Sequence, residues 1–297
     1  MSALRGVARR LYRAIPFRQP VFELVRRLVE LPEPVYRHLH FEGVIEVPVE
    51  GRSFRMVHHG TQIENEVFWS GLYGRWEGAS LRMWVRAARG AAAILDVGTN
   101  TGLYALAARA VAPHARVAAI EPVERIRAKL IANVALNRFE IAVIAAAASD
   151  RDGTATLLDP GGAQPLSATL DPSGRVLGAQ GAEHVTVPVA RIDSLIAQGA
   201  VPPPDLLKID VEGHEGAVLR GMERHLRERR PVLLIEVLTP EAAADVNALV
   251  EPLGYLVHRL DGEGPRRLPE VAPAAGTNLI LATAEDWDRI RAAPAEG

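Results

Sequence analysis

The chain has 297 residues, of which 48% are hydrophobic and 24% charged, and its formal net charge is −2. This balance argues against a general nucleic-acid-binding surface, and the absence of cysteine excludes a disulfide scaffold, a cysteine zinc site, an iron–sulfur cluster and a cysteine nucleophile. At roughly 100–200 residues per domain, the length predicts one large domain or one domain with an appendage.

Residues 1–40 are predicted to form two helical pieces, broken at Pro16 and Pro20 and ending at Pro32 and Pro34. Apolar side chains share one face of the first piece, and arginines fill the other. Three interpretations are open: a helix that packs on the main domain or on a partner, a basic helix that lies weakly on a membrane surface, and a partly disordered leader.

The first residues carry no targeting pattern. Arginines interrupt the apolar run that a secretory signal needs. No stretch of about 18 apolar residues is present, as a membrane-spanning helix requires. The sequence therefore predicts a cytoplasmic protein without a membrane span, and it does not indicate an oligomeric state.

Alternating side chains over residues 43–57 predict a β-hairpin that turns at Glu50 and Gly51. An aromatic-rich segment follows at residues 68–77 and carries two of the four tryptophans. Aromatic faces stack on sugars and rings, so this segment is expected to form a wall of a substrate pocket. The candidate substrate-binding residues are Trp69, Tyr73, Trp76 and Glu77.

From residue 91 the pattern changes to strands that alternate with helices, which is typical of a parallel sheet with helices on both faces. Strands are expected at 93–97, 116–120, 141–147, 205–210, 232–237, 255–260 and 278–283. Helices are expected near 102–111, 123–136, 192–198, 214–227 and 240–252. The predicted fold is α/β: a doubly wound, mostly parallel, seven-stranded sheet, Rossmann-like, with an N-terminal helical and hairpin extension.

These elements divide the chain into an extension at 1–90, a cofactor-binding domain at 91–285 and a C-terminal tail at 286–297. The extension has no motif of its own, and we expect it to cap the site or to recognise substrate. An insertion at 151–190 contains a Gly-, Pro- and Ser-rich loop at 159–183 between two short strands. That loop is the candidate for a mobile or lid-like segment.

The first strand of the domain runs into a glycine-rich turn, Asp96-Val97-Gly98-Thr99-Asn100-Thr101-Gly102, and a helix starts at once. Ligands of open α/β sheets bind at the carboxyl ends of strands. Gly98 and Gly102 allow a tight turn and a close approach by a ligand. Asn100 stands where a dinucleotide fingerprint has its middle glycine, and the chain lacks the Gly-Lys-Ser/Thr of a phosphate loop.

The next two strands also end in polar residues. Glu121-Pro122 follows the second strand, 19 residues after Gly102, where a carboxylate can accept hydrogen bonds from ribose hydroxyls. The alternative is an acid that stabilises a helix N-terminus. Ser149 and Asp150 follow the third strand and suit an adenine edge, although a simple turn explains them almost as well.

Asp210 ends the fourth strand, so acids are expected at four strand ends: Asp96, Glu121, Asp150 and Asp210. NAD carries a pyrophosphate, which prefers helix N-terminal amides and a glycine-rich cradle. S-adenosylmethionine carries a sulfonium cation, which carboxylates stabilise. The acids therefore favour S-adenosylmethionine as the cofactor. The candidate cofactor-binding residues are Asp96, Gly98, Thr99, Asn100, Gly102, Glu121, Pro122, Ser149, Asp150 and Asp210.

The glycine-rich turn resembles the first motif of class I S-adenosylmethionine-dependent methyltransferases. The second half narrows the resemblance to the FkbM-type family, through Ala190-Arg191-Ile192-Asp193-Ser194-Leu195, Leu207-Lys208-Ile209-Asp210-Val211-Glu212-Gly213-His214-Glu215, Val218-Leu219-Arg220-Gly221 and Leu234-Ile235-Glu236. Trp76-Glu77 is similar to what precedes the first motif in that family. The resemblance covers about residues 60–283. It implies a Rossmann-like methyltransferase fold and O-methylation of a hydroxyl on a sugar, a polyketide or another secondary metabolite.

A transfer to a hydroxyl needs a group that takes the proton, and the strand ends offer three candidates. Asp210 is the first, for base action or for positioning; His214 is the second and Glu236 the third. Lys208, one of only two lysines in the chain, shares a strand face with Asp210. A buried ion pair that organises the sheet end is the alternative for both. No metal is expected, since the ligand-type residues here lack a His-Glu-x-x-His spacing.

Two other functions are open at this point. One is an NAD-linked oxidoreductase on a related sheet, and the other is a non-catalytic module that binds S-adenosylmethionine. The preferred hypothesis is an S-adenosylmethionine-dependent methyltransferase acting on a small hydroxylated molecule, without a nucleic-acid partner.

Overall fold

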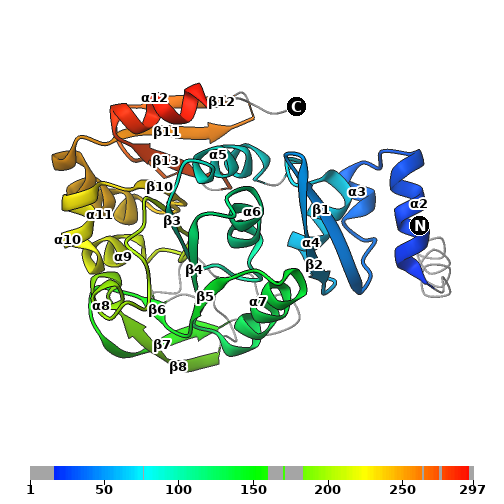
Figure 1. Cartoon of the computed structure of the whole chain (residues 1–297), viewed down its shortest axis with the longest axis horizontal. Coiled ribbons are helices and arrows are strands. Elements are labelled where there is room, and N and C mark those ends of the chain that lie inside the picture. The colour runs from blue at the N-terminus through cyan, green and yellow to red at the C-terminus, as the bar shows by residue number, and fades with distance from the viewer. Residues whose placement is uncertain are drawn as a thin grey trace.

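The computed structural model describes residues 17–75, 77–159, 170, 183–262, 264–273 and 276–293. In this part of the chain, one central sheet lies between two helical layers, and the N-terminal hairpin and its helices extend to one side (Figure 1). No described helix is long and apolar enough to cross a membrane. Several predicted features lie outside the described residues: the first helical piece up to residue 16, Trp76, nearly all of the 159–183 loop and the last four residues.

The described central sheet has eight strands in the order β12-β11-β13-β10-β9-β3-β4-β5. Five pair in parallel: β3 (Ala93–Val97), β4 (Arg116–Ile120), β5 (Ile141–Ile144), β9 (Leu206–Ile209) and β10 (Val232–Ile235). The others pair antiparallel at one edge: β11 (Leu256–Asp261), β12 (Gly264–Leu268) and β13 (Leu279–Ala282). All seven expected strands are therefore confirmed as members of one sheet.

The eighth strand, β12, was not predicted. Its sequence, Gly-Pro-Arg-Arg-Leu, has no apolar alternation, and its middle three residues are exposed. It lies at the sheet edge, where charged residues and proline are common because they prevent further pairing.

Helices cover both faces of the sheet. One layer contains α5 (Gly78–Ala88), α6 (Leu103–Val111) and α7 (Glu124–Asn137), with α12 (Ala284–Ala292) beside α5. The other contains α8 (Ile192–Ala197), α9 (Glu215–Gly221), α10 (Glu223–Arg229) and α11 (Pro240–Val250), followed by the short 3₁₀ helix η1 (Glu251–Leu253). The helix expected at 214–227 is thus two helices, which meet at Met222, where the backbone leaves the helical region.

The third predicted strand, 141–147, was too long. The central-sheet strand ends at Ile144, and β6 (Ala147–Ala148) pairs instead with β8 (Glu183–Ala190). With β7 (Gly153–Asp159), these strands form a separate three-stranded sheet. The two strands expected in the insertion are therefore present. Because β6 pairs with one of them, the chain leaves the central sheet after Ile144.

The N-terminal region contains α2 (Arg18–Leu28), α3 (Glu33–Tyr36), β1 (Gly43–Val49), β2 (Arg52–His58) and α4 (Gln62–Ser70). The expected break at Pro20 was wrong, because Pro20 lies in the first turn of α2, where a backbone N–H has no helical partner. Pro34 likewise lies in the first turn of α3, as its second residue, rather than ending a helix. The hairpin turn is as predicted: Glu50 and Gly51 both have positive φ, 45° and 72°, as a two-residue hairpin turn requires.

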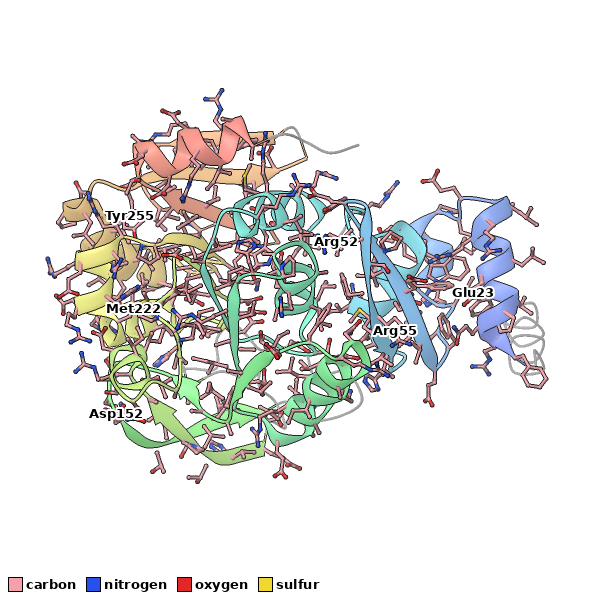
Figure 2. The ribbon with its side chains drawn as sticks, viewed as in Figure 1. Glu23, Arg52, Arg55, Asp152, Met222 and Tyr255 are labelled. Atoms are coloured by element: carbon pink, nitrogen blue, oxygen red, sulfur yellow. The ribbon has the colours of Figure 1, made fainter. Side chains whose placement is uncertain are left out.

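The edge of β2 is attached to α7 by two asparagines. The Asn137 side chain accepts a hydrogen bond from the backbone N–H of Arg55 (2.7 Å) and donates one to the backbone carbonyl of Arg55 (2.6 Å), the residue labelled in Figure 2. Asn133 accepts from the Val57 N–H (2.8 Å) and donates to the Thr101 carbonyl in the glycine-rich turn (2.9 Å). The hairpin is thereby connected to the turn that follows β3. The division of the chain at residue 90 stays a prediction.

Candidate active site

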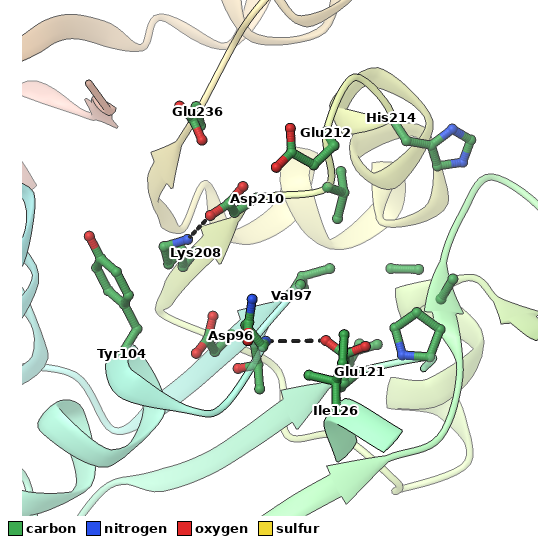
Figure 3. A pocket seen from close by; sticks show the side chains of 18 of the residues that line it. Asp96, Val97, Tyr104, Glu121, Ile126, Lys208, Asp210, Glu212, His214 and Glu236 are labelled. Carbon is green, nitrogen blue, oxygen red and sulfur yellow. Dashed lines mark hydrogen bonds and ion pairs between the residues drawn. The ribbon is translucent and has the colours of Figure 1, made fainter. Parts of the chain in front are cut away.

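A cavity of about 300 Å³ opens where β3, β4, β9 and β10 end. Its walls come from the turns after these strands, from Ile63 and Glu77 in the N-terminal region and from Leu157 in β7 (Figure 3). This size lies within the range of small-molecule sites. The cavity is at the reversal of strand order between β3 and β9, where open α/β sheets bind their ligands.

Gly98 holds the turn after β3 against the end of β9. Its φ is +76°, and a Cβ there would lie 1.8 Å from the carbonyl oxygen of Asp210. The turn is tied on both sides, since the Gly98 N–H donates to the Ile120 carbonyl (3.1 Å) and the Asp210 N–H donates to the Val97 carbonyl (3.0 Å). Only glycine fits this close approach, so the turn and the Asp210 backbone are positioned together.

One end of the cavity is lined by ionisable groups, and we call it the charged end: Glu77, Asp96, Tyr104, Lys208, Asp210 and Glu236. The Lys208 Nζ lies 2.7 Å from Asp210 Oδ2 and 4.5 Å from the centre of the Tyr104 ring. The Tyr104 hydroxyl donates to Glu77 Oε2 (2.6 Å). Asp96 is the register neighbour of Lys208 across β3 and β9. A buried ammonium is thus surrounded by carboxylates and an aromatic face.

The charged groups at this end of the cavity shift the pKa values of one another. Burial alone would lower the pKa of Lys208, but the carboxylates of Asp210, Glu77 and Asp96 outweigh it and raise that pKa above its ordinary value. Burial, then the nearby acids Asp210 and Glu77, raises the pKa of Glu236 to about 8. Burial also raises the pKa of Glu77 and of Asp96, against the attraction of Lys208. Four carboxyl groups therefore surround one ammonium, and the raised pKa of Glu236 leaves its carboxyl largely protonated at neutral pH.

Carboxylate oxygens of Glu77, Asp210 and Glu236 all lie within 4.8 Å of one another. Hard divalent cations take such oxygen ligands. The Lys208 ammonium already places a positive charge against Asp210, so the cluster has a cation of its own. That no metal takes part stays a prediction.

The opposite end, which we call the apolar end, surrounds Glu121 with Ile126, Ala147, Ala148 and Leu157. Glu121 Oε2 accepts the Asn100 N–H (3.1 Å) and Oε1 accepts the Val123 N–H (2.9 Å). Burial raises the pKa of Glu121 to about 7. Each carboxylate oxygen has a second lone pair, so the side chain can still accept hydrogen bonds from two hydroxyls beside apolar walls.

The structure brings most of the predicted catalytic and cofactor residues to this cavity, namely Asp96, Gly98, Thr99, Asn100, Glu121, Pro122, Lys208, Asp210, His214 and Glu236. Gly102 does not line it; with φ +99° it starts α6 and packs on Leu130. His214 also lines the cavity, but Figure 3 shows it on the side away from Glu236, with Glu212 between them in this view.

Ser149 and Asp150 do not line the cavity. Ser149 Oγ lies 3.1 Å from His214 Nε2, so it contacts the site only through that ring. Asp150 is exposed, with Oδ2 3.7 Å from Arg220 Nε. The reason is the early end of β5 at Ile144, which places these two residues beside β8 instead of at a central strand end.

Of the four expected substrate residues, only Glu77 reaches the cavity among those the structure describes. Trp69 packs on Phe22 (5.4 Å between ring centres) and donates to the Leu39 carbonyl (3.2 Å). Tyr73 lies beneath the Arg82 guanidinium (5.8 Å). These rings belong to the core and surface of the N-terminal region, and Trp76 lies outside the described residues.

The sequence interpretation missed Tyr104, Ile126 and Leu157. Tyr104 is the second residue of α6, so its place directly after the glycine-rich turn was an available signal. Ile126 in the first turn of α7 had the same signal after Glu121. Leu157 had none, since only the pairing of β7 with β8 brings it to the cavity.

The donor set fits a ligand that carries a positive charge. The described lining has one lysine, Lys208, no arginine, and six acidic side chains, namely Glu77, Asp96, Glu121, Asp210, Glu212 and Glu236. A phosphate-bearing cofactor would meet this excess of acids unfavourably, whereas a sulfonium would be stabilised by it. The charged end therefore suits the sulfonium of S-adenosylmethionine, and the apolar end suits a ribose and a flat base.

A family model for the methyltransferase FkbM domain matches residues 96–257. The chain belongs to the FkbM family of S-adenosylmethionine-dependent methyltransferases. The matched region contains the glycine-rich turn, Glu121 and the whole block from Lys208 to Glu236. Membership in this family sets aside the NAD-linked alternative.

Two curated relatives and one solved structure are similar to this FkbM-family chain. It is 30% identical to the 31-O-demethyl-FK506 methyltransferase FkbM of Streptomyces tacrolimicus, over 63% of this chain and 77% of that protein. It is 29% identical to the AMB antimetabolite synthetase AmbE of Pseudomonas aeruginosa, over 69% of this chain but 11% of that protein. The crystal structure of methyltransferase FkbM from Methylobacillus flagellatus matches with 19% identity and a TM-score of 0.40, over 64% of this chain and 43% of that one.

Proposed function

We propose that this chain methylates a hydroxyl oxygen of a small molecule. The observation that carries the proposal is the Lys208–Asp210 pair (2.7 Å) beside Glu236, a carboxyl whose pKa is raised to about 8. A general base works best when its pKa lies near the operating pH. An alcohol must lose its proton to become a good nucleophile, and this cluster provides a group for that task.

The apolar end would hold the adenosine part of the cofactor. Glu121 would accept hydrogen bonds from the ribose hydroxyls, and Ile126, Ala148 and Leu157 would pack on the base. The acids of the charged end would face the sulfonium. S-adenosylmethionine, when bound, would supply an electrophilic methyl group on a positively charged sulfur. The sulfur would be the leaving group, as the neutral thioether of S-adenosylhomocysteine.

The three base candidates differ in surroundings, and these surroundings change their order. Asp210 has one oxygen on the Lys208 ammonium, which suits it to orient an acceptor hydroxyl. Glu236 has the raised pKa and lines the same end, so we place it first as proton acceptor. His214 lies beside Ser149 at the other side of the cavity, which makes it the last of the three.

The proposed acceptor is a hydroxylated secondary metabolite, such as a polyketide or a sugar. The name of the Streptomyces relative describes a methyltransferase of an O-demethylated FK506, and this supports an oxygen acceptor on a small molecule. The chain's net charge of −2 and the acids of the cavity disfavour a nucleic-acid substrate.

The direct test is a screen with S-adenosylmethionine labelled in its methyl group. Hydroxylated metabolites are incubated with the protein, and mass spectrometry follows both label transfer and formation of S-adenosylhomocysteine. We expect one labelled methyl on an acceptor oxygen, and its loss in Glu236→Gln. If S-adenosylhomocysteine binds but no acceptor gains label, the chain is a non-catalytic binding module; label on nitrogen alone would refute the oxygen acceptor.

A further inference from the structure

We propose that the outer face of α2 binds the surface of a membrane that contains anionic lipids. The proposal rests on a row of exposed apolar side chains. Phe17, Val21, Leu24 and Leu28 are 83%, 40%, 58% and 72% exposed. Single exposed apolar residues are common on protein surfaces, but a contiguous row marks an interaction site.

The spacing of these residues places them together. Val21, Leu24 and Leu28 recur three and four residues apart within α2, so they share one face of the helix. Phe17 is the residue directly before the helix and lies four residues before Val21. It therefore extends the row at its N-terminal end. We call these four residues the outer row. In Figure 1, α2 lies farthest from the central sheet among the described elements, with the hairpin region beside it.

The inner face of the same helix is fixed to the hairpin region. Phe22 is 3% exposed and contacts the Phe41 and Trp69 rings at 6.1 and 5.4 Å. The Arg26 guanidinium donates to the Phe68 carbonyl (2.6 Å). Among the described residues, the helix therefore has one side that packs on the hairpin region and an opposite side that carries the exposed outer row.

Charge around the outer row favours an anionic surface. Arg18 lies three residues before Val21 and Arg27 three residues after Leu24, which places the two arginines on opposite flanks of the row. The one acid of the helix, Glu23, lies on the inner side, where Gln19 bonds both Glu23 Oε1 (2.9 Å) and the Val44 carbonyl of the hairpin (2.7 Å). Apolar residues flanked by arginines are the pattern of helices that lie in a membrane interface.

The sequence before the helix strengthens this charge asymmetry. Seven of the first 30 residues are arginines and two are glutamates, although the whole chain has a net charge of −2. Basic residues near an anionic bilayer each contribute about 1 kcal/mol to binding. The outer row therefore follows an arginine-rich stretch of sequence and is itself flanked by Arg18 and Arg27, which favours an anionic lipid surface over a neutral protein groove.

The test measures cosedimentation of the full chain with phosphatidylcholine vesicles, with and without phosphatidylglycerol. We expect binding to the anionic vesicles that weakens at high salt. The double variant Leu24→Ser, Leu28→Ser should lower the partition coefficient by about tenfold for each leucine. Arg27→Gln should lower it by about fivefold on anionic vesicles only.

Ile131→Ser is the matched control. Ile131 is an apolar side chain of α7 with 50% exposure, so its loss should leave vesicle binding unchanged. Thermal melting of all variants checks that they fold. No binding to anionic vesicles at low salt, equal losses in Ile131→Ser, or self-association that depends on the outer row without vesicles would each overturn the proposal. Vesicle binding needs no methyl acceptor, so the result is independent of the proposed reaction.

Discussion

The two ends of the cavity are built from neighbouring strands but by different means. At the charged end, Lys208 in β9 pairs with Asp210, which follows β9, beside Glu236, which follows β10. At the apolar end, the Glu121 carboxylate is held by two backbone N–H groups, while the Arg127 guanidinium donates to the Glu121 backbone carbonyl (3.1 Å). The first arrangement is the one that we propose for proton transfer, and the second offers a fixed pair of acceptors among apolar walls.

This difference teaches that an acid at a strand end can serve either of two purposes, which its partners decide. Backbone donors fix the orientation of Glu121 without a mobile partner, as suits recognition of a rigid ligand. The Glu236 carboxyl, whose pKa is raised to about 8, keeps its proton near neutral pH, as suits proton transfer. Substitutions at the two ends should therefore separate turnover from cofactor binding.

The largest effect is expected at Glu236. Glu236→Gln should lower kcat by about 10²–10⁴-fold, the usual contribution of a general base, and change the dissociation constant of S-adenosylhomocysteine only slightly. Steady-state kinetics and calorimetry measure the two quantities. Glu215→Gln is the control: burial raises the pKa of Glu215 to about 7, but this residue does not line the cavity, so kcat should be unchanged.

Asp210→Asn comes next, with an expected loss of about 100-fold in turnover. Asparagine keeps the shape but removes the charge that pairs with Lys208, so an acceptor would lose its orientation while the cofactor stays bound. Turnover equal to that of the wild type would remove Asp210 from the mechanism. A loss of cofactor affinity as large as the loss of turnover would show that Asp210 also binds the cofactor, and would contradict the division of roles between the two ends of the cavity.

The pH dependence of turnover follows from the raised pKa of Glu236. Its carboxyl must be ionised to accept a proton, so kcat should rise as the pH increases through about 8. In Asp210→Asn one repelling carboxylate is gone, and the midpoint should fall toward neutral pH. A profile that is flat across this range would contradict Glu236 as the base.

Stability should change with pH in the opposite direction. Burial raises the pKa of Glu215 from 4.5 to about 7, so the folded state binds its proton more tightly than the unfolded chain. That contribution is complete below pH 4.5 and is lost as the pH rises to about 7, by on the order of 1 kcal/mol per pKa unit. Melting curves across this window should show a decline that Glu215→Gln reduces. An unchanged slope would show that the Glu215 pKa is not raised.

The smallest effect is expected from metal removal. Because Lys208 already provides a positive charge at Glu77, Asp210 and Glu236, a chelator should leave kcat within about twofold, and added Mg²⁺ should not increase it. Kinetics with and without EDTA measure this. A strong loss that Mg²⁺ restores would show that these oxygens hold a cation.

The sequence predicted the sheet because its buried strands are continuous apolar runs, such as Val232–Ile235. It also predicted the acids of the cavity, since residues directly after parallel strands meet at one edge. It failed for Ser149 and Asp150 because the pairing of β6 with β8, 35 to 43 residues apart in the chain, decides where they lie. Such distant pairing has no local signal.

The aromatic residues show the second limit. Trp69 and Tyr73 were expected at the cavity because aromatic side chains serve both cores and binding sites. Trp69 instead completes a cluster with Phe22 and Tyr36, and only the packing of α2 and α3 on α4 reveals this. Tyr104 does line the cavity, as its place after the glycine-rich turn allows, but no spacing in the sequence predicts its contact with Lys208, which joins α6 to β9.

The central claim is that Glu121 serves cofactor binding while Asp210 serves transfer. Calorimetric titration of S-adenosylhomocysteine into the wild type, Glu121→Ala and Asp210→Asn tests it most directly. We predict that Glu121→Ala weakens binding by about tenfold or more, the size expected for lost hydrogen bonds to a charged group, while Asp210→Asn stays within a few-fold of the wild type. No binding by the wild type, or equal binding by the wild type and Glu121→Ala, would contradict the account.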